Sequence, residues 1–243
     1  MKGIILAGGL GTRLHPLTRI TNKHLLPVYD KPMIYYPIQM LVNAGIEDIM
    51  VVTGGSNSGD FLRLLGNGKE FGLKRIHYGY QEGEGGIADA LNTAREFVGD
   101  DKMVVVLGDN IIEKNIKKAA ADFKKQKKGA KVILKEVANP KEYGVAEVVN
   151  GRVKRIIEKP KNPVSNLAVI GIYFYPPEVF NIIGKLKPSK RGELEITDVN
   201  NAYIKRNMMT HEILDGWWMD SGESKDALLD ANILVKKSGA NKI

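Results

Sequence analysis

The sequence of 243 residues contains no cysteine. This absence excludes disulfide bonds, zinc sites built on thiolates and a cysteine nucleophile. It fits a chain that stays in a reducing compartment, and we therefore expect a cytoplasmic protein.

Long hydrophobic runs are also missing. No stretch reaches the about 18 consecutive apolar residues of a membrane-spanning helix, so we expect no contact with a membrane. The apolar run Gly3–Ala7 has the length of a strand and is too short for the hydrophobic part of a signal peptide. Apolar residues make up 43% and charged residues 26%, the balance of a globular chain that can bury a sizeable core.

Acidic residues are outnumbered by basic ones, 28 against 36, which gives a net charge of +8. A nucleic-acid-binding protein and an enzyme that handles several phosphates both fit this excess. The densest basic run is Lys124–Lys128, and its nearest aromatic residue, Phe123, fits the core-facing side of a helix. We interpret the run as a solvated helix face and expect no nucleic-acid partner.

Strand and helix patterns alternate in the first half of the chain. The predicted elements are strands at Gly3–Ala7, Asp48–Thr53, Leu73–Tyr78 and Met103–Leu107, and helices at Met33–Ala44, Asp60–Leu65 and Ile87–Val98. Strands that are apolar throughout are buried on both faces, and their alternation with helices predicts a mostly parallel sheet.

The second half has a more mixed pattern. The predicted elements are strands at Ala130–Glu136, Val145–Asn150, Arg152–Glu158 and Ala168–Tyr175, and helices at Glu195–Arg206 and Ser224–Val235. Asn150-Gly151 is a strong hairpin signal between two of these strands. Because no linker is evident, we predict a single α/β domain over residues 1–243, with an added β-rich subregion.

A glycine-rich loop, Gly8-Gly9-Leu10-Gly11-Thr12-Arg13, follows the first predicted strand. Glycines permit close approach of the backbone to a ligand, and consecutive N–H groups hold phosphate oxygens. Arg13 adds a guanidinium that suits phosphate, and Lys23 adds a compact charge. A tight turn alone would explain the glycines but not these two cations, so the loop predicts phosphate binding.

Two familiar phosphate motifs do not fit the chain. The dinucleotide fingerprint fails because its last glycine position, counted from Gly9, is Leu14. The P-loop fails because Gly68-Lys69 is followed by Glu70.

Longer motifs occur in order from residue 3 to about residue 222. They are Gly8–Leu14, Lys23–Pro27, Asp30–Pro37, Leu107–Asn110, Tyr143–Val145, Glu158–Pro160, Arg191–Asp198 and Trp218–Gly222. Together they resemble the sugar-phosphate nucleotidyltransferase family, and within it the short form of the thymidylyl-transferring branch. The resemblance implies a Rossmann-like three-layer fold with a mostly parallel mixed central sheet and a small β-rich sugar-binding subregion. It assigns residues 1–110 mainly to the nucleotide and residues 130–222 mainly to the sugar phosphate.

The same resemblance implies a reaction. A thymidylyl group would pass from dTTP to α-D-glucose 1-phosphate, giving dTDP-glucose and pyrophosphate by Mg²⁺-assisted in-line attack, with dTDP-rhamnose assembly as the usual destination. The sugar phosphate is already an anion near neutral pH, so no general base is required. Catalysis then depends on positioning and charge neutralisation.

The resemblance also implies roles for individual residues. The implied catalytic residues are Arg13, Lys23, Asp109 and Lys159. The implied nucleotide-binding residues are Leu6, Gly8, Gly9, Gly11, Thr12, Arg13, Gln81, Gly86 and Asp109. The implied sugar-phosphate-binding residues are Asn110, Tyr143, Gly144, Glu158, Lys159, Val169 and Arg191. Asp109 and Asp220 are the implied ligands of Mg²⁺.

Without the resemblance, the isolated residues keep simpler interpretations. Asp109 and Asp220 both fit turn positions, Lys159 fits a surface ion pair with Glu158, and Arg191 fits a solvated loop. None of the four histidines has the spacing of a metal site or is interpreted as catalytic.

The sequence leaves two alternatives to the thymidylyltransferase activity open. A uridylyltransferase that makes UDP-glucose has the same chemistry, although Lys23-His24-Leu25-Leu26-Pro27 departs from the pattern usual in uridylyl relatives. A non-catalytic sugar-nucleotide sensor would be expected to lack a key charge, and none is missing. Residues 82–85 depart from the long bacterial relatives. The resemblance is to the short form, so we do not expect the regulatory site that an extension helps form in the longer relatives. The resemblance further implies a homo-oligomer.

Overall fold

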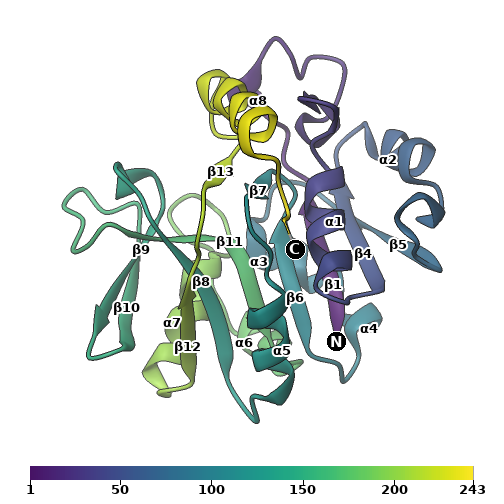
Figure 1. The fold of residues 1–243 in the computed structure, drawn as a ribbon. Coiled ribbons are helices and arrows are strands. Elements are labelled where there is room, and N and C mark those ends of the chain that lie inside the picture. Colours follow the sequence, from purple (N-terminus) through teal and green to yellow (C-terminus); the bar gives the residue numbers. More distant parts are fainter. Residues whose placement is uncertain (243) are drawn as a thin grey trace.

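The computed structural model describes residues 1–242. Within them, helices cover both faces of a nine-stranded sheet (Figure 1). The strands of this sheet are β1 (Lys2–Ala7), β4 (Asp48–Gly54), β5 (Arg75–Gln81), β6 (Met103–Leu107), β8 (Ala130–Glu136), β9 (Gly144–Val149), β10 (Arg152–Glu158), β11 (Leu167–Tyr175) and β12 (Met209–Ile213).

The sheet has a parallel part and a largely antiparallel part. Strands β5, β4, β1 and β6 lie side by side and are all parallel. Strand β11 then runs antiparallel to β6, and it also pairs with β8 and β9. The predicted hairpin of β9 and β10 extends one edge, and β12 lies parallel to β8 at another. The predicted mixed sheet of an α/β fold is therefore confirmed.

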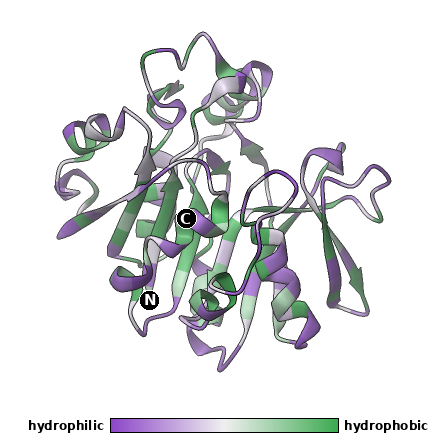
Figure 2. Ribbon diagram, turned by 180° about the vertical axis from the view of Figure 1, so that it is seen from behind, coloured by the Kyte–Doolittle hydropathy of each residue, from purple (hydrophilic) through white to green (hydrophobic). Residues whose placement is uncertain are grey.

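The helices form two layers, one on each face of the sheet. One layer contains α1 (Tyr35–Asn43), α2 (Ser58–Leu65) and α5 (Lys117–Lys125); the other contains α3 (Ile87–Asn92), α4 (Arg95–Val98), α6 (Val179–Ile183) and α7 (Ile196–Lys205). Strand β1 supplies both layers, because Ile4 and Leu6 pack in one core while Ile5 and Ala7 pack in the other. The central strands are accordingly hydrophobic along their length (Figure 2).

A smaller unit stands above one end of the sheet. It contains α8 (Lys225–Ser238) and two short ribbons, β2 (Pro27–Val28) with β3 (Lys31–Pro32), and β7 (Asn110–Ile112) with β13 (Trp218–Asp220). A third apolar cluster, which includes Leu14, Tyr36 and Ala231, holds these pieces together. The Ser224 hydroxyl, in the first residue of the predicted helix, accepts the Ala227 N–H and caps α8, which begins one residue later at Lys225.

Three local differences from the sequence expectations have physical reasons. The helix predicted over Ile87–Val98 is interrupted at Thr93, whose hydroxyl donates to the carbonyl of Ala90 (2.8 Å). Helix α1 begins at Tyr35, two residues later than predicted, after a turn that closes on Met33. Strand β12 was not predicted, because its sequence Met-Thr-His-Glu-Ile is polar and lies at an edge of the sheet.

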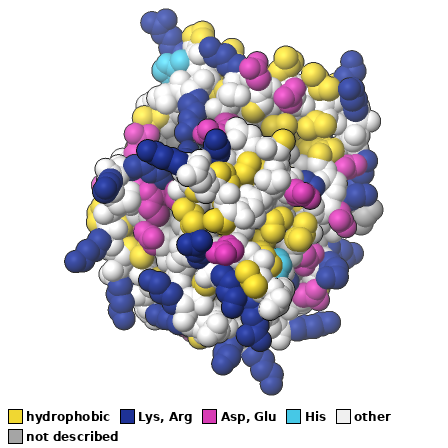
Figure 3. Space-filling model, turned by 90° about the vertical axis from the view of Figure 1, so that its left-hand side faces the viewer, with side chains coloured by type: hydrophobic (Ala, Val, Ile, Leu, Met, Phe, Trp, Pro, Cys, Tyr) yellow, Lys and Arg dark blue, Asp and Glu magenta, His cyan; other side chains and the backbone are white. Residues whose placement is uncertain are grey.

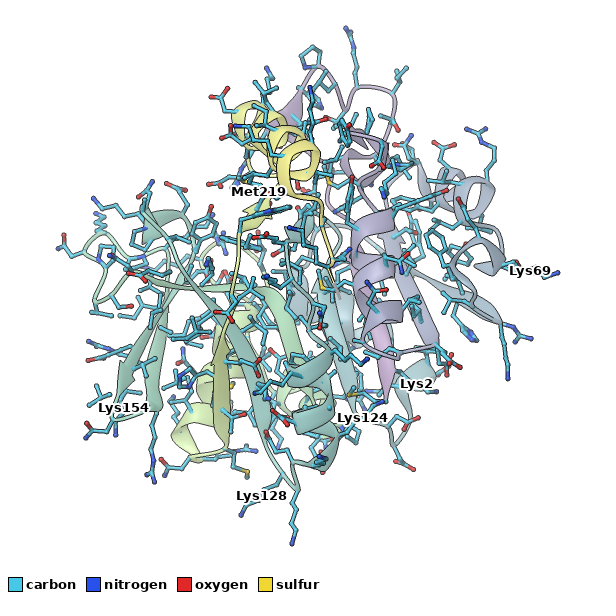
Figure 4. All side chains as sticks on the ribbon, in the orientation of Figure 1. Lys2, Lys69, Lys124, Lys128, Lys154 and Met219 are labelled. Atoms are coloured by element: carbon cyan, nitrogen blue, oxygen red, sulfur yellow. The ribbon has the colours of Figure 1, made fainter. Side chains whose placement is uncertain are left out.

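The basic run lies on α5 and in the turn that follows it. Ala119, Ala120 and Phe123 are buried on this helix, whereas Lys124 and Lys128 are exposed. Lys128 lies at the lower edge of the molecule in Figure 4. On the face drawn in Figure 3, basic side chains are spread out among acidic ones and do not gather in one patch. Within the described residues, no helix has the length and apolar character required to cross a membrane.

Candidate active site

The order of the central strands creates a crevice at one edge of the sheet. The chain proceeds from β1 outward to β4 and β5, and then returns to place β6 on the other side of β1. Such a reversal leaves a gap beyond the carboxyl ends of the two strands, where open α/β sheets bind ligands. The glycine loop follows β1, and Gly108-Asp109-Asn110 follows β6, so both predicted motifs border this crevice.

The glycine loop is packed tightly against Lys23. Gly11 has the left-handed φ of 67°, and a Cβ added to it would lie 2.9 Å from Cβ of Lys23. The Thr18 hydroxyl stabilises the loop by donating a hydrogen bond to the carbonyl of Gly11 (2.7 Å). Asn22 accepts the N–H of His24 and caps the short turn that carries Lys23. These contacts direct the Lys23 ammonium into the crevice.

Lys23 and Asp109 form a buried ion pair. Lys23 Nζ lies 2.5 Å from Asp109 Oδ2, and the Asn110 amide donates to Asp109 Oδ1 (3.1 Å). Burial by itself raises the pKa of Asp109, but the charge of Lys23 and these hydrogen bonds outweigh it and hold the pKa below its usual range. Asp109 is therefore a carboxylate in this site.

Asp220 lies beside this pair because of the β7–β13 ribbon. The antiparallel register places Asp220 opposite Asn110, the residue after Asp109. The Ser221 N–H and hydroxyl both donate to the carbonyl of Asp109 at 3.0 Å, which ties the two segments together. Burial and the charge of Asp109 raise the pKa of Asp220 to about 7, against the opposing effect of Lys23.

Asn110 connects this cluster to the neighbouring strand. Its side-chain oxygen accepts the indole N–H of Trp218 (2.7 Å) and the backbone N–H of Gly171 on β11 (3.0 Å). A Cβ on Gly171 would lie 2.8 Å from the Asn110 amide nitrogen, so only glycine fits there. One side chain thus fixes β7, β13 and β11 relative to Asp109.

Two cavities open on either side of the cluster. The first, which we call the glycine-loop cavity, is lined by Leu6, Gly8, Gly9, Lys23, His24, Gln81, Gly86 and Asp109, among others. The second, which we call the β9–β11 cavity, is lined by Arg13, Asn110, Tyr143, Gly144, Glu158, Lys159, Val169, Arg191 and Trp218, among others. Ile87, Leu107, Glu193 and Asp220 line both. The two cavities therefore meet at Asp220.

Polar side chains in the β9–β11 cavity are held by one another. Thr197 donates its hydroxyl to Glu158 (2.6 Å), and Tyr143 donates to Glu223 (2.6 Å). Lys159 follows the end of β10 with a positive φ of 41°, and its N–H donates to the carbonyl of Tyr143 (3.1 Å). The Arg191 guanidinium donates to both carboxylate oxygens of Glu195, at 3.1 and 2.7 Å.

Most of the residues singled out in the sequence come together here. Of those expected at the nucleotide, six line the glycine-loop cavity: Leu6, Gly8, Gly9, Gln81, Gly86 and Asp109. Gly11 and Thr12 lie in the glycine loop outside both linings, and Arg13 lines the β9–β11 cavity. All seven residues expected at the sugar phosphate line the β9–β11 cavity.

Sequence reasoning passed over several residues that shape the site. His24 is buried beneath Gly108, where an added Cβ would lie 2.7 Å from its ring. Burial and the charge of Lys23 lower the pKa of His24 to about 3, so the ring is neutral and bonds to the Asn22 side chain (2.7 Å). Thr197 and Glu193 were also missed, although both lie in a motif already recognised, Arg191–Asp198. Their position in that motif was the available signal.

A glycine loop, a lysine–carboxylate pair and two meeting cavities suit an enzyme that joins two phosphate-bearing substrates. The chain belongs to the Nucleotidyl transferase family, which it matches over residues 2–238.

Several individual proteins of this family are similar to the chain over most of its length. A glucose-1-phosphate thymidylyltransferase of Neisseria meningitidis serogroup A is 47% identical over 230 residues, which are 91% of this chain and 78% of that protein. One from Mycolicibacterium smegmatis is 44% identical and covers 97% of this chain and 82% of its own length. A crystal structure of a Bacillus anthracis protein assigned as a glucose-1-phosphate thymidylyltransferase, in complex with a sucrose, has a TM-score of 0.93 and 50% identity over 97% of this chain and 95% of that one. A UDP-glucose pyrophosphorylase complexed with UDP-glucose is more distant, with a TM-score of 0.83 and 28% identity over 97% of this chain and 98% of that one. The resemblance found in the sequence is therefore confirmed.

Proposed function

We propose that this nucleotidyltransferase transfers the thymidylyl group of dTTP to α-D-glucose 1-phosphate and releases dTDP-glucose and pyrophosphate. The observation that carries the proposal is the cluster of Lys23, Asp109 and Asp220 at the point where the two cavities meet. Relatives with that activity are 47% and 44% identical to the chain and support the choice of base and sugar.

The two substrates fit the two cavities. The N–H groups of Gly8 and Gly9 are suited to the triphosphate at the carboxyl end of β1. Lys159 and Arg191, in the other cavity, supply positive charge for the sugar phosphate. We accordingly propose that residues 1–110 mainly bind the nucleotide and residues 130–222 mainly bind the sugar phosphate, within a single domain.

Chemistry at the α-phosphorus needs little from the protein beyond placement and charge. The sugar phosphate is an anion near neutral pH and attacks without a general base. The Lys23 ammonium lines the glycine-loop cavity beside Asp109 and would neutralise charge on the reacting phosphates. Arg13 lines the β9–β11 cavity, and we propose that it reaches the pyrophosphate from that side.

The carboxylates fit Mg²⁺. Within residues 1–242, no group of three or more His, Cys, Asp or Glu side chains is arranged to hold a metal alone. Mg²⁺ is instead bound by one or two carboxylates together with substrate phosphates and water. Asp220 can supply such a ligand, because its half-buried carboxylate accepts only the Gly222 N–H (3.1 Å) among the described residues. Asp109 and Asp220 would hold the ion, which would neutralise the phosphate charge.

The binding of Mg²⁺ should depend on pH through Asp220. Its pKa is raised from 3.8 to about 7, so in the metal-free protein this side chain binds a proton that the cation must displace. We expect the affinity for Mg²⁺ to rise up to about tenfold per pH unit below about pH 7 and to level off above it. Calorimetric titration across this range measures the effect, and Asp220→Asn should abolish the dependence. An affinity that stays constant below about pH 7 would contradict the assignment.

The same shift affects stability. Between about pH 4 and pH 7 the folded metal-free protein binds more protons at Asp220 than the unfolded chain does. The contribution of this group to the free energy of unfolding therefore decreases as the pH rises through that window.

Pyrophosphate release tests the reaction. The purified protein is mixed with Mg²⁺ and glucose 1-phosphate, and dTTP, UTP, dATP and GTP are compared as donors. We expect fast release with dTTP that stops when glucose 1-phosphate is left out. Much faster release with UTP would favour the uridylyltransferase, and no release with any donor from a folded protein would favour the sensor. Self-association stays a prediction that rests on the resemblance, and a cytoplasmic location stays a prediction that rests on the absence of cysteine.

A further inference from the structure

The side chain of Gln81, at the end of β5, is held in one orientation. Its amide nitrogen donates to Oδ2 of Asp89 (2.8 Å) and to the backbone carbonyl of Gly86 (3.1 Å). Both partners are acceptors, since a carboxylate and a carbonyl have no hydrogen to donate. Turning the amide over would set Gln81 Oε1 against two oxygens, so the chemistry of the partners fixes the orientation.

The oxygen of the same amide faces the glycine-loop cavity. Gln81 lines this cavity and is only 6% exposed. A Cβ added to Gly8 would lie 2.9 Å from Gln81 Oε1, so this oxygen points toward the loop that borders the crevice. No donor among residues 1–242 bonds to it. The side chain therefore offers the cavity an acceptor and withholds its donors.

An acceptor in this place distinguishes between pyrimidines. Thymine and uracil carry a hydrogen on N3, which such an oxygen accepts, whereas N3 of cytosine has a lone pair and meets the oxygen unfavourably. We propose that Asp89 determines which pyrimidine the enzyme takes, by fixing the Gln81 amide with its oxygen toward the base. This inference rests on the proposed function in one respect, that the glycine-loop cavity holds the base of the nucleotide.

The absence of a side chain at Gly85 leaves space for the Asp89 carboxylate to bond to Gln81. A Cβ added to Gly85 would lie 2.5 Å from Asp89 Oδ2, so a larger residue there would displace the carboxylate. Asp89 lies in the first turn of α3 and is not part of either cavity lining. It acts through Gln81 and is a positioning residue.

Direct binding separates this role from a purely structural one. Dissociation constants of dTTP, dUTP and dCTP are measured by calorimetry with Mg²⁺ and without sugar phosphate, for the wild type, Asp89→Ala and Asp89→Asn. We expect the wild type to prefer dTTP over dCTP by at least about tenfold. Asp89→Ala should reduce that preference at least about fivefold, because only Gly86 still orients the amide. Asp89→Asn, whose oxygen is able to accept the same bond, should lose less of it.

The experiment has two internal controls, the uracil nucleotide dUTP and the variant Glu82→Ala. The ratio of dTTP to dUTP should stay unchanged in all variants, because the two bases share the N3 hydrogen. Glu82→Ala, an exposed neighbour in the same loop, should leave every ratio unchanged.

If Asp89 had only a structural role, Asp89→Ala would weaken the binding of all three nucleotides equally, and that result would overturn the proposal. A wild type that binds dTTP and dCTP with equal affinity would also overturn it. The experiment measures nucleotide binding and no turnover. Its result can therefore be interpreted even if the enzyme acts on a sugar phosphate other than glucose 1-phosphate. Formation of dTDP-glucose together with an unchanged ratio in Asp89→Ala would keep the proposed function and reject this inference.

Discussion

Replacing Asp109 with asparagine is expected to lower kcat by about 10³-fold. The substitution keeps the size of the side chain but removes the charge that pairs with Lys23 and that, beside Asp220, would bind Mg²⁺. It also leaves a buried ammonium with a weaker partner, so the free energy of unfolding should fall by about 1–3 kcal/mol. Activity is measured at a temperature where circular dichroism shows the variant to be folded.

The matched control for this variant is Asp122→Asn. Asp122 also pairs with a lysine, Lys118 (3.1 Å), but it lies exposed on α5 and lines neither cavity. We expect no change in kcat and little change in stability, since exposed pairs contribute little. Similar activities of Asp109→Asn and Asp122→Asn would remove Asp109 from the reaction.

Adding a single methyl group at Gly222 should be nearly as damaging. A Cβ there would lie 2.4 Å from Asp109 Oδ2 and 2.7 Å from Lys23 Nζ. Gly222→Ala therefore has to push apart the two charges that the site brings together, while removing no functional group. We expect kcat to fall about 10²-fold, because a small misplacement of reacting groups has effects of this size.

The control for this prediction is another glycine-to-alanine change. Gly59 lies in α2 with nothing within 4 Å of an added Cβ and without a left-handed backbone. Gly59→Ala should keep full activity and raise the free energy of unfolding by about 0.5 kcal/mol. If Gly222→Ala retained activity within about threefold of Gly59→Ala, the close packing around the ion pair would have no role in catalysis.

The parallel part of the fold could be predicted because its signals are local. The strand at Met103–Leu107 was predicted at the bounds that the structure shows, since five apolar residues in a row fit a strand buried on both faces. Asp109 could be placed at the crevice for the same reason, because it lies two residues after the end of that strand. The glycine loop was recognisable from composition alone.

The pairing of Asp109 with Asp220 could not be derived from local patterns. It depends on β7 and β13, two strands of three residues each, separated by more than a hundred residues. Strands this short have no detectable periodicity, so only the resemblance connected them. The β12 strand was missed because it is polar. The hydrogen bond between Gln81 and Asp89 was missed because the spacing of residues in a sequence does not indicate which side chains pair across a loop.

The most direct test of the account is isotope exchange between pyrophosphate and dTTP. The central claim is that both substrates meet at Lys23, Asp109 and Asp220 and react in one displacement, with no nucleotidyl group attached to the protein. Labelled pyrophosphate is incubated with dTTP, Mg²⁺ and the enzyme, with or without glucose 1-phosphate. The account predicts that label enters dTTP only when glucose 1-phosphate is present. Exchange in its absence would show a covalent intermediate and contradict the direct displacement.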